Sequence, residues 1–245
     1  MDLNVNKLIN DATIEILVNK NPKKVVRDLY ELINTDKTNT ELIKNTLALA
    51  FFENKNYAEA AKIYYELNKQ YQAGYCELLL GNKTKAKELW FNAQNSGAVC
   101  WARCLIDLIE VKVGLIPTFL QIRNHLESDL CYFIQADKIE YAENVIQCSD
   151  FLTDINPETN KFIGKALMNS GFPSLSIDFF IKSREIIPND PEVYFYIARY
   201  SFETGALNEA RQFLKQCLDL NMSYTPAKKL LDKIGKQLLS GIKPN

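Results

Sequence analysis

The 245-residue chain is poor in several residue types, and each shortage excludes a class of protein. Nine glycines and eight prolines are too few for a collagen-like or low-complexity chain. The single histidine, His125, excludes a histidine-rich metal site. The net charge of -1 lacks the excess of Lys and Arg that general nucleic-acid binders carry, so we expect no nucleic-acid partner. A hydrophobic fraction of 47% instead predicts a packed chain.

The sequence also lacks long apolar runs. A membrane-spanning helix needs ~18–20 apolar residues, and the most apolar stretch, 100–116, is interrupted by four charged residues. The first residues show no basic segment followed by an apolar one, so no signal peptide is predicted. The six cysteines contain no CxxC pair. We therefore expect a cytoplasmic protein with reduced thiols and no membrane insertion.

What the sequence does contain is an internal repeat. Residues 157–190 and 191–224 both begin with Pro-Glu, and similar residue types recur 34 positions apart. The matched pairs are Gly171 and Gly205, Ser176 and Ala210, Phe180 and Leu214, and Ser183 and Cys217. Small residues at these positions let two amphipathic helices approach closely, and each helix pair buries its apolar face by stacking on the next. The pattern predicts an array of helix pairs.

This spacing resembles the tetratricopeptide repeat (TPR), a 34-residue unit with small residues in both helices, a bulky residue in the second helix and a closing proline, here Pro188. The resemblance is best over 157–224, continues over 41–67 and in shortened form over 73–97, and is looser over 6–40.

The resemblance implies an all-α fold, a right-handed α-α superhelix or helical solenoid of about six to seven helix pairs. The segment Thr225–Leu239 is interpreted as a capping helix. We divide the chain into TPR-like repeats over 1–97, degenerate helical repeats over 98–156, and two well-matched units plus the cap over 157–245.

In the TPR family two positions of each first helix point into a concave groove. In this sequence those positions are occupied by Lys161, Lys165, Phe195, Arg199, Lys229 and Lys233. A cationic line with aromatic neighbours suits an acidic peptide, a free C-terminus or a phosphorylated tail. The alternative is an ordinary solvated surface, since Glu158, Glu192 and Glu203 are near enough in sequence to neutralise part of the charge. Lys165 replaces the asparagine of the chaperone-tail clamp, so that subtype is not expected.

The search for a catalytic or metal site finds weak candidates. Cys100 and Cys104 lie one helical turn apart and are interpreted either as metal ligands, with Cys76 or His125, or as buried packing residues, which their apolar neighbours favour. His125 beside Glu127 is either a general base or an ordinary surface histidine. Phosphate-binding and hydrolase motifs are absent. We predict no enzyme activity, no catalytic residue, no metal and no cofactor.

The leading hypothesis is a non-catalytic protein–protein interaction scaffold that binds a peptide or protein segment in its groove. An RNA-binding helical repeat is one alternative. Self-association is another, because 123–156 carries seven acidic and two basic residues and could meet the basic C-terminal groove of another copy. A more apolar groove at Asn45, Leu49 and Phe52 is a further candidate surface, although packing is the favoured role for Phe52.

Overall fold

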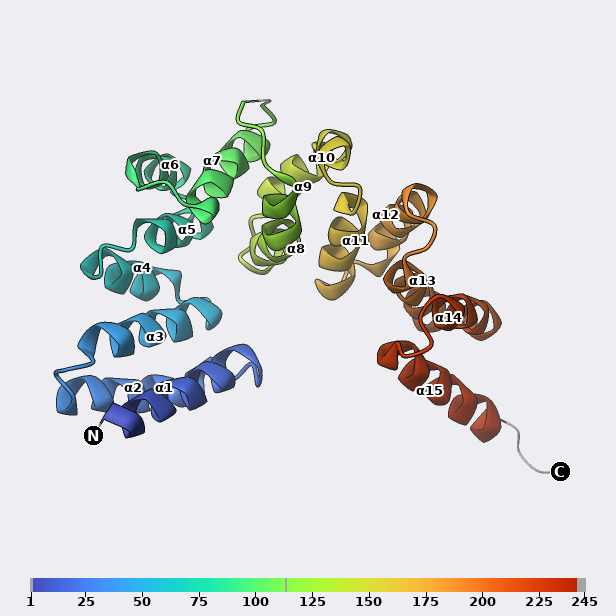
Figure 1. Cartoon of the computed structure of the whole chain (residues 1–245), viewed down its shortest axis with the longest axis horizontal. Coiled ribbons are helices and arrows are strands. Elements are labelled where there is room, and N and C mark those ends of the chain that lie inside the picture. The colour runs from blue at the N-terminus through green and yellow to red at the C-terminus, as the bar shows by residue number, and fades with distance from the viewer. Residues whose placement is uncertain (1, 113, 242–245) are drawn as a thin grey trace. The chain divides into compact units, whose positions relative to one another are not determined.

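The chain folds into α-helices connected by short turns (Figure 1). The computed structural model describes the backbone of residues 2–112 and 114–241, and the side chains of 5–112 and 114–237. Within these ranges there are fifteen helices and no strand. The predicted all-α fold of stacked helices is therefore confirmed, whereas the right hand of the superhelix stays a prediction.

The first seven helices are α1 (Asp2–Leu17), α2 (Pro22–Thr35), α3 (Thr40–Glu53), α4 (Tyr57–Glu66), α5 (Gln70–Leu80), α6 (Lys83–Asn92) and α7 (Gly97–Ile109). The other eight are α8 (Phe119–Gln135), α9 (Ile139–Gln147), α10 (Ser149–Ile155), α11 (Thr159–Asn169), α12 (Pro173–Ile186), α13 (Pro191–Glu203), α14 (Leu207–Leu220) and α15 (Thr225–Gly241).

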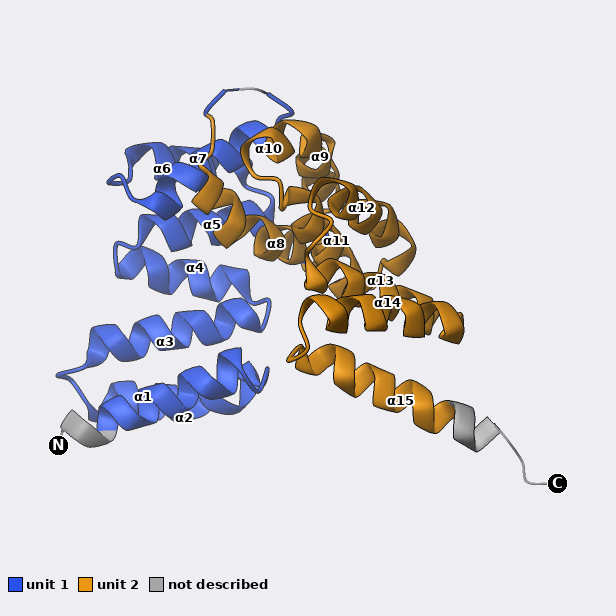
Figure 2. Ribbon diagram, turned by 45° about the vertical axis from the view of Figure 1, so that its right-hand side comes forward, with its two compact units in different colours: residues 1–115, 136–138 blue, residues 116–135, 139–245 orange. Residues whose placement is uncertain are grey.

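Contacts between helices divide the chain into two units (Figure 2). Unit 1 consists of 1–115 and 136–138 and contains α1 to α7, and unit 2 consists of 116–135 and 139–245 and contains α8 to α15. All six predicted groove residues lie in unit 2. The predicted division by repeat regularity, 1–97, 98–156 and 157–245, stays a prediction, and residues 1 and 242–245 at its ends lie outside the described residues.

Short turns join the two helices of six pairs among the described residues: α1–α2, α3–α4, α5–α6, α8–α9, α11–α12 and α13–α14. Each of these turns contains a residue with positive φ, namely Lys20, Lys55, Gly81, Asp137, Gly171 and Gly205. Glycine adopts this left-handed conformation without the steric cost that a Cβ brings. Asp137 lies 34 residues before Gly171, so the segment interpreted as degenerate retains one turn in register.

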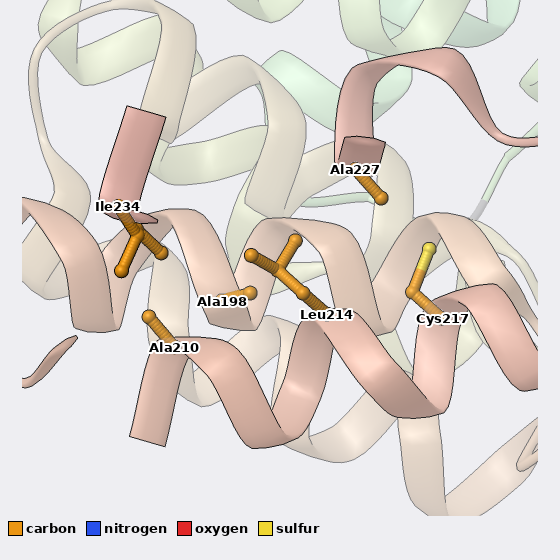
Figure 3. Packing of buried hydrophobic residues seen from close by; sticks show 6 residues of the cluster. All are labelled: Ala198, Ala210, Leu214, Cys217, Ala227 and Ile234. Atoms are coloured by element: carbon orange, nitrogen blue, oxygen red, sulfur yellow. The ribbon is translucent and has the colours of Figure 1, made fainter. Parts of the chain in front are cut away.

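The small and bulky positions of the repeat meet in the core of unit 2. A Cβ placed on Gly164 would lie 2.8 Å from the Phe180 ring, so only glycine lets α11 and α12 approach this closely. One repeat later, Ala198 and Leu214 are fully buried. Figure 3 shows the same core closed by α15, whose buried Ala227 and Ile234 pack on this cluster. The segment interpreted as a cap thus packs against the preceding pair.

None of the described helices combines the length and apolar character needed to cross a membrane.

Candidate functional site

The six predicted groove residues lie on α11, α13 and α15 of unit 2, and the structure separates them into two groups. Lys161 and Lys165 of α11 are engaged with carboxylates of the chain itself. Phe195 and Arg199 of α13 and Lys229 and Lys233 of α15 instead line one hollow. The register therefore places all six on comparable helices without giving them the same surroundings.

Lys161 is only 6% exposed and is surrounded by acidic groups. Its Nζ lies 2.6 Å from Glu158 Oε1, 2.7 Å from Asp190 Oδ2 and 3.5 Å from Glu192 Oε2. Desolvation alone would lower the pKa of Lys161, but hydrogen bonds to Asp190 and Glu158 outweigh it and raise the pKa. Asp190 also accepts a hydrogen bond from the Glu192 backbone N–H and so caps α13. This ammonium consequently ties α11 to the start of α13.

Lys165, one turn further along α11, bridges two other helices. Its Nζ lies 3.0 Å from Glu127 Oε2 on α8 and 3.0 Å from Glu192 Oε1 on α13. Desolvation opposes the charged form here too, yet hydrogen bonds to both glutamates raise the pKa of Lys165. We call Lys161, Lys165 and their four acidic partners the ion-pair cluster. Their charges are already compensated within the chain. A ligand-binding role for these two lysines stays a prediction.

The second group lines a concave surface between α13 and α15, which we call the C-terminal hollow. Its volume is about 330 Å³, and its lining residues are Phe195, Arg199, Phe202, Glu203, Pro226, Lys229, Leu230 and Lys233. Pro226 and Leu230 were not among the predicted site residues. Helical spacing of i, i+3, i+4 and i+7 places them on the same face of α15 as the predicted Lys229 and Lys233, and this spacing was the signal that could have found them. The hollow thus combines an apolar lining with three cations and one carboxylate.

In the C-terminal hollow the cation on α13 is paired with a carboxylate, whereas the two cations on α15 are not, within the described part of the chain. Arg199 Nε donates to Glu203 Oε1 at 2.9 Å, and Arg199 Nη1 donates to Asn169 Oδ1 at 3.2 Å. Lys233 Nζ lies 4.9 Å from the centroid of the Phe202 ring, within cation–π range. Among the described side chains, neither Lys229 nor Lys233 has a carboxylate within ion-pair distance, and both are exposed. The α15 side of the hollow is therefore its electropositive side.

Two tyrosine rings pack against Phe195, which lines the C-terminal hollow. The Phe195 ring lies 5.4 Å from the Tyr196 ring and 5.5 Å from the Tyr224 ring, centroid to centroid. Edge-to-face and tilted contacts of this kind hold aromatic side chains in defined orientations. Phe195 is therefore a preorganised part of the wall.

The cysteine and histidine candidates lie in packed surroundings. Burial is the main cause that raises the pKa of Cys104 to about 11 and that of Cys76 to about 12, which disfavours the thiolate that binds metals. Cys100 is half-buried. Among the described side chains, no group of three or more His, Cys, Asp or Glu residues is arranged to hold a metal ion. His125 on α8 is half-buried, and burial lowers its pKa.

The apolar groove predicted in unit 1 is partly filled by aromatic packing. The Phe52 ring lies 5.4 Å from the Tyr57 ring and 5.9 Å from the Tyr75 ring. This agrees with the favoured packing role of Phe52. Asn45 and Leu49 are half-buried.

No family model matches the chain. No curated protein matches it either. Similar solved structures include the APC/C hetero-tetramer Cut9-Hcn1 at 15% identity and a TM-score of 0.39, over 93% of this chain and 42% of that one. This chain thus spans less than half the length of that relative.

Two further similar structures are described as TPR proteins. One is YrrB, a TPR protein with an unusual peptide-binding site, at 14% identity and a TM-score of 0.34, over 83% of this chain and 97% of that one. The other is the P58(IPK) TPR domain, at 12% identity and a TM-score of 0.38, over 97% of this chain and 67% of that one. These structures are too distant to show what kind of repeat the chain contains. The description as TPR-like rests on features of the chain itself: its helix pairs, the positive-φ residues in the turns, and the packing of small against bulky residues. On that evidence the chain is built of TPR-like helix pairs.

Proposed function

We propose that this protein is a non-catalytic interaction scaffold whose C-terminal hollow binds a carboxylate-bearing peptide segment of another protein. One observation carries the proposal: Lys229 and Lys233 stand uncompensated beside the aromatic side chains of Phe195 and Phe202. Charged and aromatic groups that line one concave surface are typical of peptide recognition.

The arrangement of charges indicates how such a segment would lie. Glu203 on α13 repels a carboxylate and already holds Arg199, so the acidic group of the ligand belongs next to α15. An apolar side chain of the ligand would then contact Phe202 and Leu230. Lys161 and Lys165 would not contribute, because their own carboxylates would have to be displaced first. The proposed site is therefore smaller than the predicted line of six residues.

Charge reversal on α15 tests the proposal. The probe is a fluorescein-labelled peptide of alternating Asp, Glu, Leu and Phe, compared with the same peptide carrying Asn and Gln in place of its acids. The wild-type chain should bind the acidic peptide more tightly, and the double variant K229E/K233E should lose at least about tenfold in affinity, or about 1.4 kcal/mol. Fluorescence anisotropy at two salt concentrations measures both effects.

The matched control is K228E/K236E, which reverses two exposed lysines of the same helix that do not line the hollow. It changes the net charge of the chain equally and should retain binding. Equal affinities for the acidic and the amide peptide, or an equal loss in both double variants, would refute the proposed site. The helical circular-dichroism spectrum should be the same for all three chains.

A further inference from the structure

A second hollow in unit 2 lies between α9 and α12, away from the basic residues considered so far. Its volume is about 480 Å³, and its lining is mainly apolar, with Ile139 and Ile146 from α9 and with Phe172, Leu175 and Phe179 at the beginning of and along α12. We call this surface the α9–α12 groove. It is formed mainly by the second helices of two pairs, with Ile134 of α8 and Leu167 of α11 completing the lining, whereas the C-terminal hollow is formed by α13 and α15.

Three large apolar side chains of the α9–α12 groove are exposed to solvent. Leu175 is 59% exposed, Phe172 is 40% exposed and Ile139 is 39% exposed. Single exposed apolar residues are normal on protein surfaces, but several that line one hollow mark an interaction site. Covering them would remove apolar surface from water, which favours association.

The rim of the groove is acidic. Glu143 of α9 and Asp178 of α12 both line the groove and are exposed, and neither has an ion-pair or hydrogen-bond partner among the described side chains. Lys182, one turn beyond Asp178, lies over the Phe179 ring at 5.7 Å and makes no ion pair with Asp178 within the described part of the chain. The groove therefore offers apolar contacts flanked by two uncompensated negative charges.

We propose that the α9–α12 groove binds an amphipathic helix of a different protein, with Leu, Ile or Phe on its buried face and Lys or Arg along the edges of that face. A groove between two helices accommodates the ridge of side chains on a third helix, and apolar residues spaced i, i+3, i+4 and i+7 form such a ridge. Basic flanks complement Glu143 and Asp178.

The same charges disfavour a second copy of this chain as the occupant. Two α9–α12 grooves facing each other would bring the carboxylates of Glu143 and Asp178 together. The lysine-rich α15 of another copy would also fit poorly, because its apolar residues Ala227 and Ile234 are buried in its own core and Leu230 and Leu231 pack against that core. The site is independent of the C-terminal hollow and has the opposite charge preference.

Binding of a designed peptide to the full-length chain tests this inference. The probe is a labelled 18-residue helix with Leu at i, i+3, i+4 and i+7 and Lys along the flanks, and its comparison peptides are a scrambled sequence and a version with Glu in place of Lys. The Lys-flanked helix should bind best. Leu175→Glu should weaken it by roughly tenfold to a hundredfold, and E143K/D178K by about tenfold.

The matched control is E140K/E185K, which reverses one exposed acid on each of the same two helices outside the groove and should bind like the wild type. Equal binding of the scrambled or the Glu-flanked peptide would overturn the proposal. So would an equal loss in the control variant. A concentration-dependent dimer in light scattering that Leu175→Glu dissociates would also overturn it, because the occupant would then be a second copy.

Discussion

Lys161 and Lys165 occupy the same repeat positions on α11 as Lys229 and Lys233 do on α15, yet the two pairs have opposite surroundings. The first two are held by the carboxylates of Glu127, Glu158, Asp190 and Glu192. The second two have no such partner among the described side chains. The first helix of the next pair, α13, supplies Glu192 to the lysines of α11, and its N-cap residue supplies Asp190. Register decides which way a side chain faces, and the neighbouring helix decides whether its charge is free.

Among the predicted changes in stability, the largest is the loss expected when the ion-pair cluster around Lys161 and Lys165 is disrupted. Lys161→Met removes the ammonium from between three carboxylates. It leaves Glu158 and Asp190 partly buried without an ion-pair partner among the residues that the structure describes, while Glu192 keeps its contact with Lys165. We expect the free energy of unfolding to fall by about 3 kcal/mol, as it does when one partner of a buried ion pair is removed. Chemical denaturation measures the change. Lys228→Met, at an exposed position, should stay within about 0.5 kcal/mol of the wild type, and a similar loss in both variants would contradict the assigned role of the cluster.

A smaller change in the free energy of unfolding is expected when the pH is raised into the alkaline range. Because the pKa values of Lys161 and Lys165 are raised above 10.5 in the folded chain, their stabilisation is complete below pH 10.5 and is lost as the pH rises through the folded values. The difference in unfolding free energy between the wild type and Lys161→Met should therefore be constant from neutral pH to about pH 9 and should shrink above pH 10.5. A difference that persists unchanged in strong alkali would rule out the ionic origin.

The smallest effect on stability belongs to the exposed pair. Replacing Lys229 and Lys233 with alanine should change the free energy of unfolding by no more than about 1 kcal/mol, since neither is held by a carboxylate and only the exposed cation–π contact of Lys233 with Phe202 is lost. Thermal melts of K229A/K233A beside Lys161→Met measure the contrast directly. If K229A/K233A lost as much stability as Lys161→Met, the proposed difference between the compensated lysines of α11 and the exposed lysines of α15 would be wrong.

A second comparison, between the regular pairs and the middle of the chain, shows how far the fold could be predicted. Phe180, which the repeat spacing matched with Leu214, is buried in the core against Gly164. The interval from α8 to α10 was predicted only as degenerate helices. There the turn at Asp137 keeps the repeat register, but α9 is short and α10 follows it before α11 begins. Sequence spacing shows the presence of helices there and does not show how an extra helix is accommodated.

The sequence predicted which helices carry the candidate site. It did not predict which of the six residues on those helices have uncompensated charges. The acidic residues near the lysines were visible in the sequence, but the carboxylate nearest to each ammonium depends on how α8, α11 and α13 cross. Glu127 illustrates this, because it reaches Lys165 from 38 positions away in sequence. The sequence did not indicate the α9–α12 groove. Leu175 is exposed and Phe180 is buried, but both are large apolar residues of one helix and the sequence does not show which of them is covered.

By itself, the sequence determined the all-α character, the 34-residue period, the pairing of small with bulky residues and the outward or inward direction of most helix positions. These are local properties that follow from 3.6-residue periodicity and from the steric freedom of glycine and alanine. The tertiary structure decided which charges are compensated and where apolar side chains remain uncovered. Those properties depend on groups brought within a few ångströms from distant segments, where Coulomb energy and desolvation change steeply with distance.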